Sequence, residues 1–241
     1  MKTIKIIPAL FTLSLFLILS ACSKDAKVTT EDLLPMAGTI HNQLLENYYQ
    51  NRLNVDPDME SMINEIIELS SDYLVSEGYD RRTIDEAEQS LKEKFGPSRL
   101  KNITNDDYSI NIGNLASELQ DLSLYSEKFL SELVYILEMV EEDADFQHVY
   151  NYINTKFLYL TFESKKDQEG QTLFTNIFNG SFSFWTNETN TCRKAAELDP
   201  SSWVIINDAI GGILGSVFGP VGSIIGAAVL SVGTNEEIKN S

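Results

Sequence analysis

Histidine and cysteine, the side chains that most often bind metals or act as bases and nucleophiles, each occur only twice in this sequence of 241 residues. A catalytic thiol at Cys192 would need a histidine base, and only His41 and His148 are available. We therefore interpret Cys192 as a small, partly buried side chain. The sequence also lacks a Gly-x-Ser-x-Gly elbow, a His-Glu-x-x-His pair, a P-loop and a phosphate-binding Gly-x-Gly-x-x-Gly turn. These absences predict a protein that is not an enzyme, with no catalytic residue, cofactor or metal site.

Acidic residues do recur at spacings that metal sites use, but each pattern is incomplete. One set follows the EF-hand spacing, with Met59 where the sharp turn needs glycine: Asn54, Asp56, Asp58, Glu60 and Glu65. We interpret it as a capped helix start. Glu142, Asp145 and His148 lie three apart, whereas a di-iron bundle needs a second Glu-x-x-His and further carboxylates. We interpret this second set as an acidic surface patch.

Positive charge is scarce as well, with 18 lysines and arginines against 36 aspartates and glutamates, and a net charge of −18. Such a balance repels polyphosphate, so we expect no nucleic-acid partner. It also opposes close approach to an anionic lipid surface. The acids are spread along the chain, which predicts a solvated coat on a single globular domain with an ordinary apolar content.

The first 22 residues have the build of a secretory signal. Lys2 and Lys5 precede an apolar run from residue 6 to residue 19, which is short for a membrane span. The run ends in Leu19-Ser20-Ala21-Cys22, which resembles the lipobox of bacterial lipoproteins. The resemblance implies that signal peptidase cuts between Ala21 and Cys22, and that Cys22 carries the acyl chains that hold the protein on membrane lipid. Two or more chains give stable attachment, because one alone binds only marginally.

If residues 1–21 are removed, the chain loses two lysines and no acid, and its net charge becomes −20. Lipidation of Cys22 would leave Cys192 without a disulfide partner. A residue other than aspartate after the cysteine resembles the outer-membrane signal of Gram-negative lipoproteins. Ser23-Lys24-Asp25 also resembles the surface-export tag of some of them, although Ala26 stands where a second acid is expected. We expect an outer-membrane lipoprotein and leave open whether it faces the periplasm or the cell surface.

Beyond Cys22 the polar stretch 22–35 predicts a tether, and 36–198 predicts an acidic α-helical domain. Apolar residues recur at helical spacing over 41–49, 59–74, 84–95, 146–160 and 173–185. Asp56-Pro57 predicts one helix start, and the capping box from Thr83 to Glu86 predicts another. Steps of threes and fours from Leu115 to Val140 predict the longest helix of the body. The fold class is therefore all-α, an irregular helical bundle.

The stretch 199–234 is apolar and rich in glycine, and 235–241 is a polar tail. From Ala209 to Val232 no residue is charged. Gly211, Gly215 and Gly219 are four apart, as are Gly222 and Gly226, which predicts a stripe along which a second backbone can approach closely. Because the segment is apolar on every side, it must be buried in protein or in lipid. Gly219-Pro220 divides it, which predicts either a helical hairpin or a kinked helix.

A kinked helix would be long enough to cross a bilayer, whereas each arm of a hairpin, at about 18–20 Å, would be too short to cross alone. The segment resembles the glycine-zipper stretches of some membrane-associated bacterial lipoproteins and of pore-forming peptides. We expect residues 203–233 to pack in the domain's own core, to self-associate or to contact the membrane.

These observations favour a lipid-anchored, non-catalytic lipoprotein of the cell envelope with a structural or interaction role. One alternative is a toxin-like or bacteriocin-like protein whose glycine-rich segment inserts into membranes. Another is an extracytoplasmic module that binds a small ligand through the aromatic cluster from Phe174 to Trp185, although those rings are also spaced for core packing.

Overall fold

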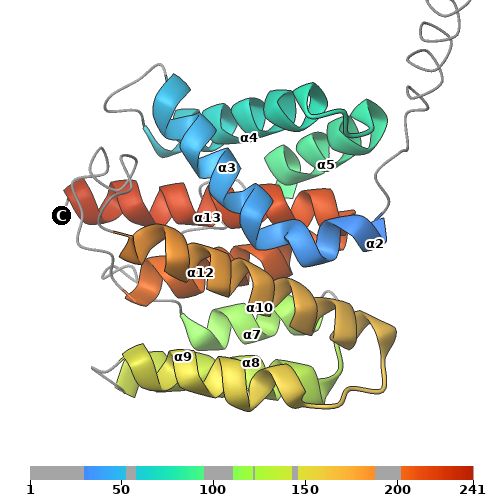
Figure 1. Ribbon diagram of the computed structural model, residues 1–241, viewed down its shortest axis with the longest axis vertical. Helices are drawn as coiled ribbons and strands as arrows, with labels where there is room; N and C mark the ends of the chain where they lie inside the picture. Colours follow the sequence, from blue (N-terminus) through green and yellow to red (C-terminus); the bar gives the residue numbers. More distant parts are fainter. Residues whose placement is uncertain are drawn as a thin grey trace, which may run out of the picture.

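A computed structural model describes the folded body of the protein (Figure 1). The described residues are 30–52, 58–94, 111–121, 123–142, 146–187 and 202–240. Within them the chain forms α-helices joined by short turns, and it forms no strand. This confirms the prediction of an all-α bundle.

The amino-terminal part of the body is a run of helices whose starts differ from the sequence prediction. A short α2 (Thr30–Leu33) and a 3-10 turn η1 (Leu34–Met36) lead into α3 (Ala37–Asn51), so helical structure begins inside the predicted tether. The next helix, α4 (Met59–Ser76), is capped by Asp58, whose carboxylate accepts a hydrogen bond from Ser61 N.

Helix α5 (Arg81–Lys94) begins two residues before the predicted threonine cap. The side chain of Asp80 accepts hydrogen bonds from both the backbone N and the hydroxyl of Thr83. Because an aspartate already occupies the capping position, Thr83 lies within the first turn, and the predicted capping box is wrong.

The single long helix predicted from Leu115 to Val140 is two helices, α7 (Ile112–Asp121) and α8 (Glu127–Glu142). Between them Ser123 has a φ of 50°, which no α-helix contains. Ser126 N donates to the buried carboxylate of Asp167, at 2.9 Å, from a distant part of the chain. This tertiary contact fixes the chain where α8 starts, and it overrides the apolar spacing that favoured a continuous helix.

Helix α9 (Phe146–Thr155) ends sooner than predicted, and a 3-10 turn η2 (Phe157–Tyr159) carries the chain to α10 (Lys165–Thr186). Ser164 caps α10, its hydroxyl accepting from Lys166 N and Asp167 N. The polar residues 163–169, which lie between the apolar patterns of 146–160 and 173–185, are therefore partly the first turn of α10.

The glycine-rich segment forms a hairpin in the middle of the bundle. It consists of α12 (Ser202–Gly215), the 3-10 turn η3 (Ser216–Phe218) and α13 (Gly219–Asn240). Helix α12 packs against α10, and α13 packs against α3, α4 and α5, so the hairpin lies between two groups of helices (Figure 1). Every residue in 204–215 and 221–235 is buried, whereas the tip, 216–220, is half-buried.

Candidate functional site

The two arms of the hairpin meet through glycine. An added Cβ at Gly211 would lie 2.5 Å from the carbonyl oxygen of Gly226, and one at Gly222 would lie 2.6 Å from that of Gly215. Four of the predicted helix-packing glycines therefore face one another in two pairs across α12 and α13. At these positions the two backbones are in direct contact, which any larger side chain would prevent.

Gly219, the fifth predicted glycine, has a different part in the hairpin. Its φ is +77°, and an added Cβ would meet nothing within 4 Å. It is the residue at which the chain reverses, because the left-handed region costs glycine little. The backbone turn selects the hairpin over a kinked helix.

Close backbone contact also occurs outside the hairpin, at two glycines that belong to no regular spacing in the sequence. Gly38 of α3 and Gly180 of α10 meet so closely that an added Cβ at Gly180 would lie 2.7 Å from the Cα of Gly38. Asn42 Nδ2 donates to Gly180 O at 3.0 Å across the same crossing. Helices α3 and α10, which pack on α13 and α12, are thus fixed to each other.

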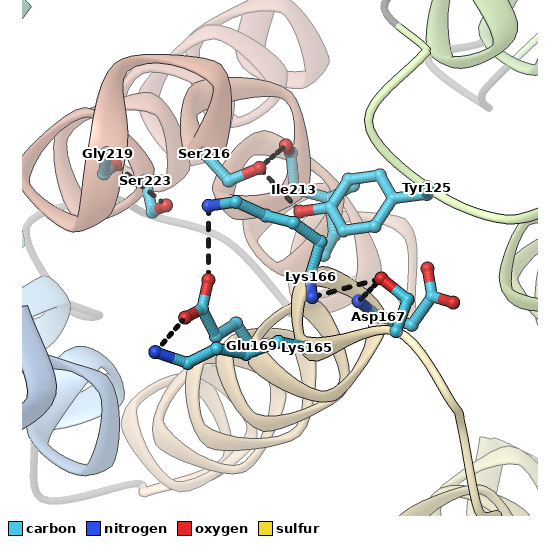
Figure 2. Close-up of polar contacts among 10 residues, drawn as sticks. Tyr125, Lys165, Lys166, Asp167, Glu169, Ile213, Ser216, Gly219 and Ser223 are labelled. Carbon is cyan, nitrogen blue, oxygen red and sulfur yellow. Dashed lines mark hydrogen bonds and ion pairs between the residues drawn. The ribbon is translucent and has the colours of Figure 1, made fainter.

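The tip of the hairpin is held by a tyrosine from the turn between α7 and α8 (Figure 2). Ser216 Oγ donates to Ile213 O at 2.6 Å, so Tyr125 OH is the donor in its 2.5 Å contact with Ser216 Oγ. Burial raises the pKa of Tyr125 to about 12, against the hydrogen bond with Ser216, which lowers it. Tyr125 therefore stays neutral and remains a donor at physiological pH.

An ion-pair group lies beside the tip. Lys166 Nζ is 3.1 Å from Glu169 Oε2, and Lys165 Nζ is 3.5 Å from Glu169 Oε1 (Figure 2). A small cavity of about 30 Å³, lined in part by Tyr125, Lys166 and Pro220, lies at this end of the hairpin. It has room for about one water molecule.

The opposite, open end of the hairpin carries a buried carboxylate. Asp208 of α12 is fully buried, and its Oδ2 accepts from Ser181 Oγ at 2.5 Å and from Trp185 Nε1 at 3.2 Å, both on α10. His41 Nε2 of α3 lies 3.5 Å from the same oxygen, and His41 Nδ1 is 3.1 Å from Asn42 Oδ1. One hairpin residue is thereby tied to two surrounding helices.

Burial controls the protonation of this pair. It raises the pKa of Asp208 to about 8, against hydrogen bonds from Ser181, Ser231 and Trp185 that favour the charged form. It lowers the pKa of His41 to about 4, against the hydrogen bond with Asn42. Between these values the pair holds one proton and has no net charge, which suits an apolar interior.

Other polar residues lie at the same end of the hairpin. Asn207 Nδ2 donates to Thr234 Oγ1 at 2.8 Å, which joins the two arms, and Asn235 Nδ2 bonds to Tyr49 OH of α3. We call this set the polar base of the hairpin: Asn207, Asp208, Ser231, Thr234 and Asn235. Its members are buried, and they connect the hairpin to itself and to the helices around it.

This arrangement does not have the geometry of a catalytic triad. Ser181 donates to Asp208 instead of to His41, so the histidine is not placed to take its proton. Ser181, His41 and Asp208 are all completely buried, so a substrate has no access to them. The chemistry that the cluster supports is a shared proton and a set of hydrogen bonds between helices.

The predicted aromatic cluster is part of the core. Phe174, Phe178, Phe184 and Trp185 are each at most 4% exposed, and their rings stack or meet edge-on with one another and with neighbouring rings. Large rings packed in this way stabilise the fold by burial and by ring contacts. The cavity at the hairpin tip is lined by other residues.

The lipidation and cleavage residues, Cys22 and Ala21, lie outside the described residues, as does Cys192. The polar base was not predicted from the sequence. One signal for it was available in the sequence: Asp208 directly precedes a stretch of 24 uncharged residues. A lone acid buried beside such a stretch needs a polar partner. Nothing in the sequence indicated that the partners would be His41 and Ser181, 167 and 27 positions away.

Comparison with known proteins adds no relative: no family model, no curated protein and no solved structure matches this chain.

Proposed function

We propose that this protein is a non-catalytic, lipid-anchored protein of the bacterial envelope that inserts its glycine-rich hairpin into a lipid bilayer. In the folded body the hairpin is covered by the surrounding helices. The observation that carries the proposal is that the two arms contact each other through Gly211–Gly226 and Gly215–Gly222, whereas they contact the covering helices mainly through apolar side chains.

These two kinds of contact respond differently to lipid. Apolar side chains gain nothing from leaving a protein core for hydrocarbon, but they lose little, because both surroundings exclude water. Close backbone packing between glycines depends on shape, and it persists in a bilayer. The side chains of the hairpin would therefore lose little on exchanging their protein cover for lipid, and its two arms would stay together.

The composition of the hairpin is compatible with lipid. The most apolar 18-residue stretch within 203–235 has a mean hydropathy of 2.0, which makes this described segment a candidate membrane segment by length and composition, although 72% of that stretch is buried in the body. Its tip, Ser216 to Pro220, is half-buried and uncharged. The end of the hairpin nearest to solvent can thus contact lipid before the body opens.

Replacing Val217 with aspartate tests insertion. Val217 is half-buried at the tip, so we expect the folded body to tolerate the charge. A charged aspartate inside the bilayer costs about 2.5–3.5 kcal/mol on insertion scales. We expect a tenfold or larger loss (about 1.4 kcal/mol or more) of vesicle binding, measured by flotation with phosphatidylcholine vesicles. The chain used runs from residue 22 with Cys22→Ser, so that acyl chains do not contribute.

Tyr159→Asp is the matched control, because Tyr159 is 76% exposed on η2, outside the hairpin. It adds the same charge and should leave vesicle binding within about twofold of the parent chain. Circular dichroism of each variant confirms that the body is folded. If Val217→Asp binds vesicles as well as Tyr159→Asp does, the hairpin does not insert.

The lipid anchor is a separate part of the proposal, and it rests on Leu19-Ser20-Ala21-Cys22. We expect mass spectrometry of the mature amino terminus to find fatty acyl groups on Cys22. We expect Cys22→Ser to move most of the protein out of envelope fractions, since acyl chains supply about 0.8 kcal/mol per buried methylene. Protease treatment of intact cells then tells surface exposure from a periplasmic location. An unacylated amino terminus would contradict the anchor and leave the hairpin proposal standing.

A second candidate function is an envelope protein with a structural or interaction role, in which the hairpin is a permanent core. The hydrogen bonds that Ser181 and Trp185 donate to Asp208, and the one that Asn235 donates to Tyr49, favour it, because they fasten the hairpin to α10 and α3. The vesicle experiment separates the two, since a permanent core gives no binding that depends on Val217.

A further inference from the structure

Most polar residues of the hairpin lie at one end. The polar base, Asn207, Asp208, Ser231, Thr234 and Asn235, lies at the open end, and the sequence continues with Glu236 and Glu237. Toward the tip, from Ala209 to Leu230, the polar side chains are Ser216 and Ser223. Both of these hydroxyls donate to carbonyls of the hairpin itself, Ile213 O and Gly219 O.

This distribution fixes the direction in which the hairpin can enter lipid. The tip brings no charge and its serine hydroxyls are satisfied within the hairpin, so it can lie in hydrocarbon at little cost. The polar base would leave Asp208, Asn235 and the following glutamates without water or protein partners. The tip therefore enters first, and the polar base stays at the lipid–water interface.

The length of the apolar part fixes how far the hairpin can go. From Ala209 to Gly219 the chain has 11 residues, and from Pro220 to Leu230 it has 11 more. At 1.5 Å per residue each arm reaches about 16 Å. The hydrocarbon core of a bilayer is about 30 Å thick, so one leaflet accounts for about 15 Å. The apolar part of the hairpin matches a single leaflet.

We propose that the hairpin enters one leaflet of the bilayer, tip first, and stops where the polar base reaches the headgroups, so that both ends remain on the same side. This inference rests on the proposed insertion and specifies its depth and direction. The hairpin then acts as a wedge in one leaflet and does not form a transmembrane segment. The occupant that replaces the covering helices is the acyl-chain layer of that leaflet.

The test places a polarity-sensitive fluorophore at one of two half-buried positions, Val217→Cys at the tip or Trp203→Cys at the open end. Both are made in the chain from residue 22 with Cys22→Ser and Cys192→Ser, so that the introduced cysteine is the labelled thiol. The probe membrane is phosphatidylcholine vesicles that contain spin-labelled lipid. The spin label lies either near the headgroup or near the end of the acyl chain.

For the tip probe we expect quenching by the deep spin label to exceed quenching by the shallow one about twofold or more, and for the Trp203 position we expect the reverse. A membrane-impermeant thiol reagent trapped inside the vesicles should not react with an unlabelled cysteine at position 217, whereas the same reagent outside should react with one at position 203. These results together support one-leaflet insertion.

Two results would overturn this depth assignment and keep insertion. One is reaction of the tip cysteine with the reagent trapped inside, which means that the hairpin crosses the bilayer. The other is shallow quenching at both positions, which means that it lies flat at the interface. If neither fluorophore changes emission or is quenched on adding vesicles, both the depth assignment and the proposed insertion fail.

Discussion

Replacing Gly215 with alanine is expected to destabilise the folded protein by about 1–3 kcal/mol, the usual cost of an extra carbon in a packed core. The new Cβ would lie 2.7 Å from the carbonyl carbon of Gly222 and 3.0 Å from the Cα of Ser223. Both are backbone atoms, so no side-chain rotation can relieve the overlap. The arms of the hairpin would have to separate, and the helices packed on them would move too. Urea unfolding followed by circular dichroism measures the change.

Gly233→Ala is the matched control, because it makes the same substitution on the same hairpin, in α13. An added Cβ there would meet nothing within 4 Å. Alanine is a better helix former than glycine by about 0.8–1.0 kcal/mol, so this variant should be as stable as the parent or slightly more stable. Equal destabilisation of the two variants would show that backbone contact between the arms does not hold the hairpin together.

The glycine contacts and the break at Gly219-Pro220 could be expected from the sequence because their cause is local. A glycine every four residues leaves one side of a helix without side chains, and Gly219-Pro220 interrupts the helix between two such stretches. Which alternative forms, a hairpin or a kinked helix, depends on the backbone at Gly219, and that conformation depends on contacts between the two arms.

The contacts of Asp208 and the break before α8 have distant causes. Asp208 meets His41 across 167 positions of sequence, and Ser126 meets Asp167 across 41. A periodic pattern reports which side of a helix is apolar and says nothing about which helix covers it. The predicted long helix was wrong for that reason: its apolar positions fit one helix, but a carboxylate on α10 holds the chain at Ser126.

The second large effect concerns pH, and it follows from the protons held by Asp208 and His41. In the folded protein the pair holds one proton between about pH 4 and about pH 8. In the unfolded chain the ordinary pKa values are 3.8 for aspartate and 6.5 for histidine. The unfolded chain therefore also holds one proton between these two values and none above 6.5. The folded and unfolded states therefore hold different numbers of protons on this pair only between pH 6.5 and about pH 8.

Asp208 has a raised folded pKa, so its contribution to stability is complete below pH 3.8 and is lost as the pH rises to about 8. His41 has a lowered folded pKa, so its contribution is complete above pH 6.5 and is lost as the pH falls to about 4. From about pH 4 to 6.5 the two slopes cancel. From pH 6.5 to about pH 8 only Asp208 changes the stability, and its contribution is lost as the pH rises.

We expect the pair to reduce the free energy of unfolding by about 2 kcal/mol between pH 6.5 and 8, at about 1.4 kcal/mol per pH unit. Asp208→Asn should abolish this loss, because asparagine does not titrate, and should uncover the histidine slope between pH 6.5 and 4. Subtracting the unfolding free energies of the two proteins at each pH removes the effect of the many surface carboxylates common to both.

The side chains that face Asp208 are His41 of α3, Ser181 and Trp185 of α10 and Ser231 of α13. Among these four, His41 is the one titratable group. An alkaline loss of the same size in Asp208→Asn would mean that another group releases the proton and that Asp208 is already charged in the folded protein.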